Sequence, residues 1–287
     1  MSSPFECSPN GASSEGRLAL LRNGYEPLPI FGKAPLWRGW RSEPVTAGLL
    51  ARIEADPRYT NHTNTGVKTG HLAVVDIDIH NPTHADFVAE TIESILGPTE
   101  VERIGSKGKA LCYYNPDPIS KITVAGITPG SDEMTVLVEF LGEGQQMAAY
   151  GVHPGTGRPY DWPNAVLDGD LLGTPLTSLP AVTPELLRQA AEMVAVILTN
   201  FGFREVAVRG LDGPRRDLSK RSGEPVSVSW LISALRCIPP SIARDEWLRI
   251  LWAVKEANLD PDLDDEERIA LLDRWSSGEL GEGGAHV

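Results

Sequence analysis

The chain has 287 residues, enough for one large domain or two modest ones, and its composition is that of a soluble globular protein. A net charge of −13 argues against a protein that coats nucleic acid by bulk attraction, although a local basic groove is compatible with it. No apolar run reaches the roughly 20 residues of a membrane span. The polar N-terminus has no secretory signal, and Cys7, Cys112 and Cys237 have no paired spacing. We therefore expect a cytoplasmic protein without membrane contact, disulfide framework or zinc knuckle.

The first 70 residues predict two short helices and one strand. Residues 17–23 form a helical pattern that stops at Gly24, and residues 45–55 form a second helix that ends before Pro57. A short strand is expected at 28–31. The segment 64–70, rich in Asn, Thr and Gly, is interpreted as a turn-rich lead into the next strand.

An apolar run at residues 71–80 predicts a strand that ends in two acids. Successive side chains of a strand point to opposite faces, so Asp76 and Asp78 share one face. Two adjacent carboxylates repel each other unless a cation lies beside them, which favours a site for hard divalent ions such as Mg²⁺ or Mn²⁺. Taken alone, this pair also fits a solvated strand end or a metal-binding glycosyltransferase. Haloacid-dehalogenase phosphatases carry Gly-Thr after the second Asp, where this chain has Ile79-His80.

A helix and a series of strands follow. Thr83 is the expected N-cap of the helix, and its apolar face recurs at Val88, Ile92, Ile95 and Leu96 before Gly97 closes it. Strands are then expected at 109–114, 122–127, 135–141 and 145–150, the last two joined by a Gly-rich turn as in a hairpin. This order predicts an α+β fold with a mostly antiparallel sheet.

A third acid strengthens the metal hypothesis. Alternation along 135–141 gives Glu139 the face of Thr135 and Leu137. If this strand lies beside the strand of Asp76 and Asp78, three carboxylates share one sheet face. Such a set can hold two metal ions roughly 3.5–4 Å apart, the arrangement that supports in-line phosphoryl displacement.

Two further stretches are candidates for phosphate binding. The turn at 103–109 contains Arg103, Ser106, Lys107 and Lys109, and its cations and backbone N–H groups could cradle a triphosphate. The stretch 151–162 fixes His153 between a strand end and a proline, where it could hydrogen-bond a phosphate or sugar. A solvated loop and a structural turn histidine are the alternatives for these two features.

The C-terminal third predicts a helical region. Residues 162–182 form an extended connector, and Thr183 with Pro184 starts a helix that runs to about residue 199. Residues 202–222 are the basic stretch of the chain and are interpreted as a linker. Three helical segments follow at 226–237, 243–257 and 266–275, with six expected core residues: Leu231, Leu235, Trp247, Ile250, Leu251 and Leu271.

Four motifs in this order resemble a known family. The motifs are Asp76-x-Asp78, Gly105-Ser106, residues 138–145 and Gly151-Val152-His153-Pro154. They resemble the bifunctional primase–polymerase domain of the archaeo-eukaryotic primase superfamily. The resemblance covers residues 15–182 and includes the earlier segments 32–40 and 64–66. Residues 226–277 are similar to the helical primase C-terminal domain of phage and plasmid proteins, and residues 183–225 are then a helix and basic linker.

The resemblance implies a template-directed nucleotidyltransferase, a DNA primase and DNA polymerase. Its fold would be an RRM-like antiparallel sheet with flanking helices, followed by a small all-α domain. Asp76, Asp78 and Glu139 match metal-binding positions, which implies two Mg²⁺ or Mn²⁺ ions. Ser106 matches a serine that contacts the incoming nucleotide. Lys109 lies near the position of a histidine in many members, and His153 matches a recurrent histidine.

The implied substrates are dNTPs or NTPs, and the implied partners are a single-stranded DNA template and a primer. The basic linker suggests that Arg215, Arg216, Lys220 and Arg221 contact the nucleic-acid backbone. The sequence has no helicase P-loop, so a helicase would be separate or downstream.

Two other functions compete with this interpretation. A catalytically silent replication-initiation or DNA-binding module would keep the primase fold, and the acidic net charge leaves room for it. A glycosyltransferase or metal phosphatase would share only Asp-x-Asp, and the Gly-Val-His-Pro stretch and the helical C-terminal region weigh against that class.

Overall fold

The structure is a computed structural model that describes residues 11–35, 37–105, 108–210, 226–236, 238, 247, 250–251, 254, 259–260 and 263–280. The chain divides into two compact units, Met1–Leu211 and Asp212–Val287. No helix among these described residues is long and apolar enough to cross a membrane. The described elements confirm the predicted α+β class.

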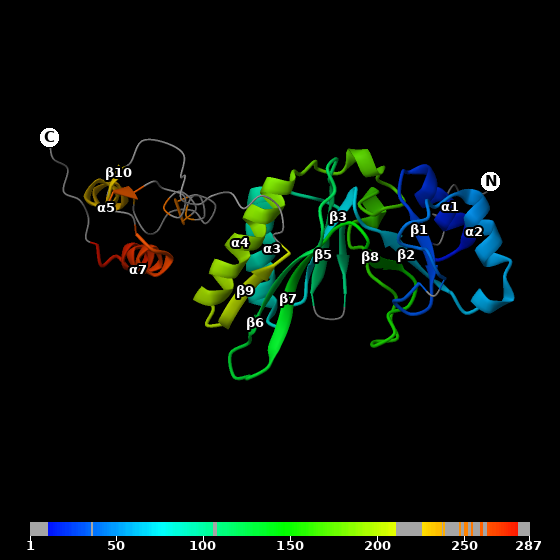
Figure 1. Cartoon of the computed structure of the whole chain (residues 1–287), viewed down its shortest axis with the longest axis horizontal. Helices are drawn as coiled ribbons and strands as arrows, with labels where there is room; N and C mark the ends of the chain where they lie inside the picture. The colour runs from blue at the N-terminus through cyan, green and yellow to red at the C-terminus, as the bar shows by residue number, and fades with distance from the viewer. Residues whose placement is uncertain are drawn as a thin grey trace, which may run out of the picture. The chain divides into compact units, whose positions relative to one another are not determined.

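A six-stranded antiparallel sheet forms the centre of the first unit (Figure 1). In spatial order the strands are β4 (Glu102–Ile104), β5 (Lys109–Tyr114), β3 (Leu72–Ile77), β7 (Met134–Leu141), β6 (Ile122–Ile127) and β9 (Arg204–Arg209). Central strand β3 is almost entirely buried, as its apolar sequence predicts. The hairpin of β6 and β7 lies beside it, with Val75 opposite Phe140.

A second sheet has three strands, β1 (Pro27–Ile30), β2 (Asn64–Lys68) and β8 (Gln146–Tyr150), with β2 in the middle. Helices α1 (Ser14–Arg22) and α2 (Ala47–Glu54) pack near β1. Two predictions are wrong here. Segment 64–70 is mostly a strand, not a turn-rich lead. The turn at 141–145 joins two different sheets, not a hairpin, because β7 pairs with β3 and β6 whereas β8 pairs with β2.

Helices α3 (Pro82–Leu96) and α4 (Pro184–Asn200) pack together on one face of the six-stranded sheet (Figure 1). The predicted cap of α4 is confirmed, since Thr183 accepts a hydrogen bond from the Leu186 N–H. The predicted cap of α3 is wrong. Asn81 caps that helix through the His84 N–H at 3.2 Å, because Pro82 occupies the first helical position.

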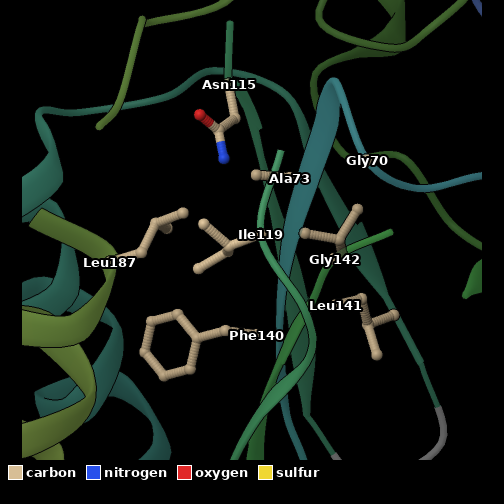
Figure 2. Close-up of a pocket in the computed structure, with 9 residues that line it drawn as sticks. Gly70, Ala73, Asn115, Ile119, Phe140, Leu141, Gly142 and Leu187 are labelled. Carbon is tan, nitrogen blue, oxygen red and sulfur yellow. The ribbon is translucent and has the colours of Figure 1, made fainter. Parts of the chain in front are cut away.

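A small cavity lies between α4 and the sheet. Figure 2 shows Leu187 of α4 facing Ile119 and Phe140, with the Asn115 amide at the upper end. Its volume of about 10 Å³ suits a single water molecule. This cavity is too small for a nucleotide, so the substrate site must lie elsewhere. It also shows which sheet face the helices cover, namely the face of Phe140.

The predicted linker is partly a strand. Residues Arg204–Arg209 form β9 and pair with β6 at the sheet edge, so this part of the basic stretch belongs to the first unit. Its backbone bends at Glu205, whose φ of 51° accompanies a shift in strand register. Arg215, Arg216, Lys220 and Arg221 lie outside the described residues.

The second unit is helical in its described part, with α5 (Val228–Arg236) and α7 (Asp265–Ser276). A short parallel pair joins β10 (Val226–Ser227) to β11 (Leu259–Asp260). The Trp275 indole is buried and donates to the Ile238 carbonyl at 3.0 Å. Predicted helix 243–257 lies mostly outside the described residues. Four predicted core residues are confirmed as buried: Leu231, Leu235, Leu251 and Leu271.

Candidate active site

Asp76 and Glu139 lie directly opposite each other on neighbouring strands β3 and β7. Directly opposed residues of an antiparallel pair share a face, so the predicted juxtaposition of the two acids is confirmed. Phe140, the next residue along β7, faces the helices. The acids therefore lie on the face that α3 and α4 leave open. Asp78 follows the end of β3, where its N–H donates to the Leu137 carbonyl at 2.8 Å.

The strand registers extend this pair into a row across the whole sheet. Arg103 of β4 opposes Ala110 of β5, which opposes Asp76. On the other side Glu139 opposes Thr123 of β6, which opposes Arg209 of β9. The acids thus lie at the centre of a row with an arginine at each end. We call these six residues the acid row: Arg103, Ala110, Asp76, Glu139, Thr123 and Arg209.

Each acid of the pair has a cationic partner. The Arg103 guanidinium lies 3.4 Å from Asp76 Oδ1, and Lys121 forms an ion pair with Glu139. Burial raises the pKa of Asp76 above its ordinary value, and the negative charges of Glu139 and Asp78 raise it further, while Arg103 and Lys33 act in the opposite direction. The raised pKa of Asp76 therefore reflects mainly the burial of its carboxyl, to which the neighbouring negative charges add.

The donor chemistry of this site fits a hard divalent cation. Carboxylate oxygens are the ligands that Mg²⁺ and Mn²⁺ prefer, and a cation would relieve the repulsion among Asp76, Asp78 and Glu139. Within the described part of the chain, no three acidic, histidine or cysteine side chains already converge on one point. Metal binding would therefore need side-chain rotation, including release of Glu139 from Lys121.

The turn before β5 packs against the end of β3. The Gly105 N–H donates to the Gly108 carbonyl at 2.9 Å, which closes the turn. A side chain at Gly108 would collide with the Ile77 carbonyl oxygen, one residue before Asp78. Only glycine permits this approach. Two predicted nucleotide-binding residues, Ser106 and Lys107, come between Gly105 and Gly108 in the sequence and lie outside the described residues.

Lys109 lies on the other side of the sheet from the acids. Ala110 shares the face of Asp76, so the preceding residue points toward α3. There the Lys109 ammonium lies 3.2 Å from Asp86 and 3.7 Å from Glu102. The structure does not bring this predicted nucleotide-binding residue together with the acids.

Arg103 is buried beneath the open face, with 8% of its side chain exposed. Its Nη1 donates to the Ala148 carbonyl at 2.9 Å, and its guanidinium carbon lies 4.9 Å from the centre of the Tyr160 ring. These contacts and the ion pair with Asp76 fix the guanidinium between the two sheets. Arg103 therefore borders both the acids and the segment that carries His153.

His153 is buried in the turn that follows β8. Its Nδ1 accepts hydrogen bonds from the Gly155 and Thr156 N–H groups, at 3.1 and 3.2 Å. Burial lowers the pKa of His153, and the positive charges of Lys33 and Arg103 lower it further. The ring is therefore neutral at pH 7, with its proton on Nε2.

Sequence reasoning assigned no role to Lys33 and Tyr160. Tyr160 packs between Arg103 and His153, with its ring centre 5.5 Å from that of His153. Lys33 lies in a two-residue turn between Phe31 and Ala34. The available signal was the Gly32-Lys33 pair, a frequent turn sequence with a cation at its tip. The place of Lys33 near the acids depends on how the two sheets pack together. The local pair Gly32-Lys33 carries no information about that packing.

The fold and the acid row define a class of protein, an α+β enzyme with carboxylates on an open antiparallel sheet face. Residues 17–182, more than half of the chain, match the family described as bifunctional DNA primase/polymerase, N-terminal, and the chain belongs to this family. Residues 231–281 match the family described as primase C terminal 2 (PriCT-2). A comparison with curated proteins found no match.

The two family matches confirm the resemblance inferred from the motifs. The protein is a primase–polymerase, a nucleotidyltransferase that acts in DNA replication on a DNA template with nucleotide substrates. The six-stranded sheet with its acid row lies within the part of the chain that matches the primase/polymerase family.

Proposed function

We propose that the chain is a template-directed primase and polymerase of phage or plasmid-type replication that uses two divalent ions. Asp76, Asp78 and Glu139 would hold Mg²⁺ or Mn²⁺ at the centre of the acid row. The observation that carries this proposal is the direct opposition of Asp76 and Glu139 on β3 and β7, with Asp78 two residues further along. The PriCT-2 match at residues 231–281 supports the replication context.

The side chains of the protein would position the ions and the substrate. Arg103 fixes one oxygen of Asp76, and Lys121 neutralises Glu139 until a cation replaces it. Bound ions would activate the primer 3′-hydroxyl and stabilise the leaving pyrophosphate. A template–primer end would approach the acids from the face opposite α3 and α4.

The nucleotide side of the site would be formed by the turn before β5 and the segment after β8. We propose Ser106, Lys107, Arg103 and His153 as residues that contact or position the dNTP or NTP. Gly108 supports this role for the turn because it lets the backbone approach Ile77 and Asp78. Lys109 could join this set only if its side chain left Asp86 and Glu102.

The template would be held partly by basic residues after the first unit. The hypothesis assigns this role to Arg215, Arg216, Lys220 and Arg221, which follow the exposed Arg209 of the acid row in the sequence. Simultaneous charge reversal of these four residues should weaken binding to single-stranded DNA and flatten its dependence on salt concentration. An unchanged salt slope would refute the assignment. A helicase would be supplied separately or downstream.

The direct test is nucleotide incorporation by the Asp78→Ala variant on primed and unprimed templates, with Mg²⁺ or Mn²⁺. We expect incorporation to be abolished while the thermal unfolding profile stays that of a folded protein. Asp132→Ala is the matched control, since the side chain of this aspartate is 99% exposed in the turn between β6 and β7. It should retain full activity. Incorporation by Asp78→Ala at the wild-type rate would refute the metal site, and no incorporation by the wild type would favour the silent replication module.

A further inference from the structure

Three buried polar atoms beside the acid row have no hydrogen-bond partner among the described residues. They are Arg103 Nε, His153 Nε2 and the Tyr160 hydroxyl oxygen. Arg103, His153 and Tyr160 are each at least nine-tenths buried. Buried polar groups almost always have partners, so three unpaired groups in one place need an explanation.

All three groups can donate a hydrogen bond. Arg103 Nε carries a proton at any physiological pH. His153 Nε2 carries the ring proton, because Nδ1 already accepts from two backbone N–H groups. The Tyr160 hydroxyl can donate as well. What these three groups lack is an acceptor, and a ligand rich in oxygen atoms would supply one.

The three side chains form one cluster around the Tyr160 ring. The Arg103 guanidinium carbon lies 4.9 Å from the ring centre, and the His153 ring lies edge-on at 5.5 Å between centres. The backbone keeps Tyr160 in place through its N–H, which donates to the Gly151 carbonyl at 3.0 Å. The donors therefore come from β4 and from the segment after β8, two parts of the chain that are distant in sequence.

Lys33 adds a positive charge at the edge of this cluster. Its backbone is fixed, because the Lys33 carbonyl accepts from Gln146 Nε2 at 2.6 Å and the Gly32 carbonyl accepts from Asn64 Nδ2 at 2.9 Å. Its side chain is exposed at the tip of the turn. The turn lies beside the segment of His153, because Asn64 Nδ2 donates to the carbonyls of both Gly32 and Val152, at 2.9 and 2.8 Å.

We propose that Lys33, Arg103, His153 and Tyr160 form a donor cluster that binds the polyphosphate chain of the incoming nucleotide without help from a divalent ion. This inference rests on the proposed function, because it places the triphosphate beside the acids that would hold the metal. The metal ions and the polyphosphate chain of the substrate would then bind to different parts of the fold. The acid row binds cations, and the donor cluster, built largely from the smaller sheet and its connections, binds the anion.

Binding of inorganic tripolyphosphate to the full chain tests this proposal, measured by calorimetry in EDTA at low salt. Loss of one charged hydrogen bond weakens binding by about 10- to 100-fold, so Lys33→Gln should show a loss of this size. Tyr160→Phe keeps the ring and removes one neutral donor, so its loss should be smaller. Arg52→Gln is the control, since this arginine is 71% exposed on α2 and should leave affinity unchanged.

The Asp78→Asn variant separates this proposal from the metal site. It removes one negative charge near the cluster, so tripolyphosphate should bind at least as tightly as to the wild type although incorporation is lost. Absence of tripolyphosphate binding to the wild type, or equal binding by Lys33→Gln, would overturn the donor cluster and leave the metal assignment standing. Full displacement of tripolyphosphate by an oligothymidylate without a terminal phosphate would assign the cluster to the template backbone and overturn the proposal as well.

Discussion

The acid row and the donor cluster are neighbouring regions whose charged and polar groups are satisfied to different degrees. In the acid row both facing carboxylates already have a cation, Arg103 for Asp76 and Lys121 for Glu139. In the donor cluster three buried donors have no acceptor among the described residues. Arg103 belongs to both regions. The contrast indicates that an anion would meet unpaired donors in the donor cluster, whereas a divalent cation in the acid row would have to displace Lys121 from Glu139.

The largest effect is expected from removing an acid of the row. Glu139→Gln keeps the size of the side chain and removes its charge. We expect nucleotide incorporation to fall on the order of 1,000-fold, because electrostatic stabilisation of the transition state is lost. Primer-extension rates measure this effect. The matched change Glu185→Gln, on an exposed side chain of α4, should leave the rate unchanged. A fall of less than tenfold in the incorporation rate of Glu139→Gln would contradict the assignment of this residue to the metal site.

A second prediction concerns the turn that borders the acids. Gly108→Ala would force the turn away from the Ile77 carbonyl, with a cost of about 1–3 kcal/mol in the free energy of unfolding. We expect a raised KM for the nucleotide as the turn moves from the end of β3. Denaturant unfolding and steady-state kinetics measure the two effects.

The control for this change is Gly48→Ala in α2. A methyl group there meets no atom closer than 4.0 Å, so the substitution should be neutral or slightly stabilising. If Gly108→Ala behaved like Gly48→Ala, the close approach of the turn to β3 would have no energetic or functional role.

A third prediction follows from the raised pKa of Asp76. In the folded protein the charged carboxylate is disfavoured, so ionisation of Asp76 lowers stability at pH values above its raised pKa. Asp76→Asn should therefore raise the melting temperature at pH 7 in metal-free buffer, since its amide oxygen can still accept from Arg103. The gain should shrink as the pH falls through the raised pKa and disappear below the ordinary pKa of aspartate, 3.8, where the wild-type carboxyl is protonated in both states. A lower melting temperature for Asp76→Asn at pH 7 would contradict the unfavourable burial of the charged Asp76 carboxylate.

The smallest effect is expected at Lys109. Its ion pairs with Asp86 and Glu102 are partly exposed, so Lys109→Gln should cost less than about 1 kcal/mol in the free energy of unfolding. Because this side chain lies on the face away from the acids, the KM for the nucleotide should stay unchanged. A KM raised tenfold or more would instead support the contact with the nucleotide that its sequence position predicts.

Local patterns were enough to predict much of the larger sheet. Strands β5 and β6 have the predicted bounds, and alternation along β7 correctly placed Glu139 on the face of Asp76. These strands carry apolar runs that are buried in the sheet, so their sequence pattern and their environment agree. The same agreement explains the correct cap of α4 at Thr183.

Elements that depend on distant partners were missed. Strand β2 has a turn-like composition, yet it is a central strand because Gly66 leaves room for Ile30 and the Gln146 side chain on its neighbours. Strand β9 is basic and forms only by pairing with β6. The position of Lys109 on the face away from the acids also depends on a distant partner, because the register that opposes Ala110 to Asp76 is a tertiary property.

Only two of the four residues of the donor cluster were predicted from the sequence. Arg103 and His153 were predicted as phosphate-binding residues, but Tyr160 and Lys33 were not assigned a role. Their proximity arises because β1, β2 and β8 form a separate sheet whose connections meet β4 beside the acids. Neither residue periodicity nor a local motif contains that arrangement.

The central claim, that Asp76, Asp78 and Glu139 hold divalent ions on the open sheet face, is tested most directly by Mn²⁺ binding. Electron paramagnetic resonance can count the ions bound by the full chain in the presence of a nonhydrolysable dNTP. We predict protein-dependent Mn²⁺ binding in the wild type and in Asp132→Ala, and its loss in Asp78→Asn and Glu139→Gln, each still folded by thermal unfolding. Equal Mn²⁺ binding by the wild type and both acid variants would contradict the claim.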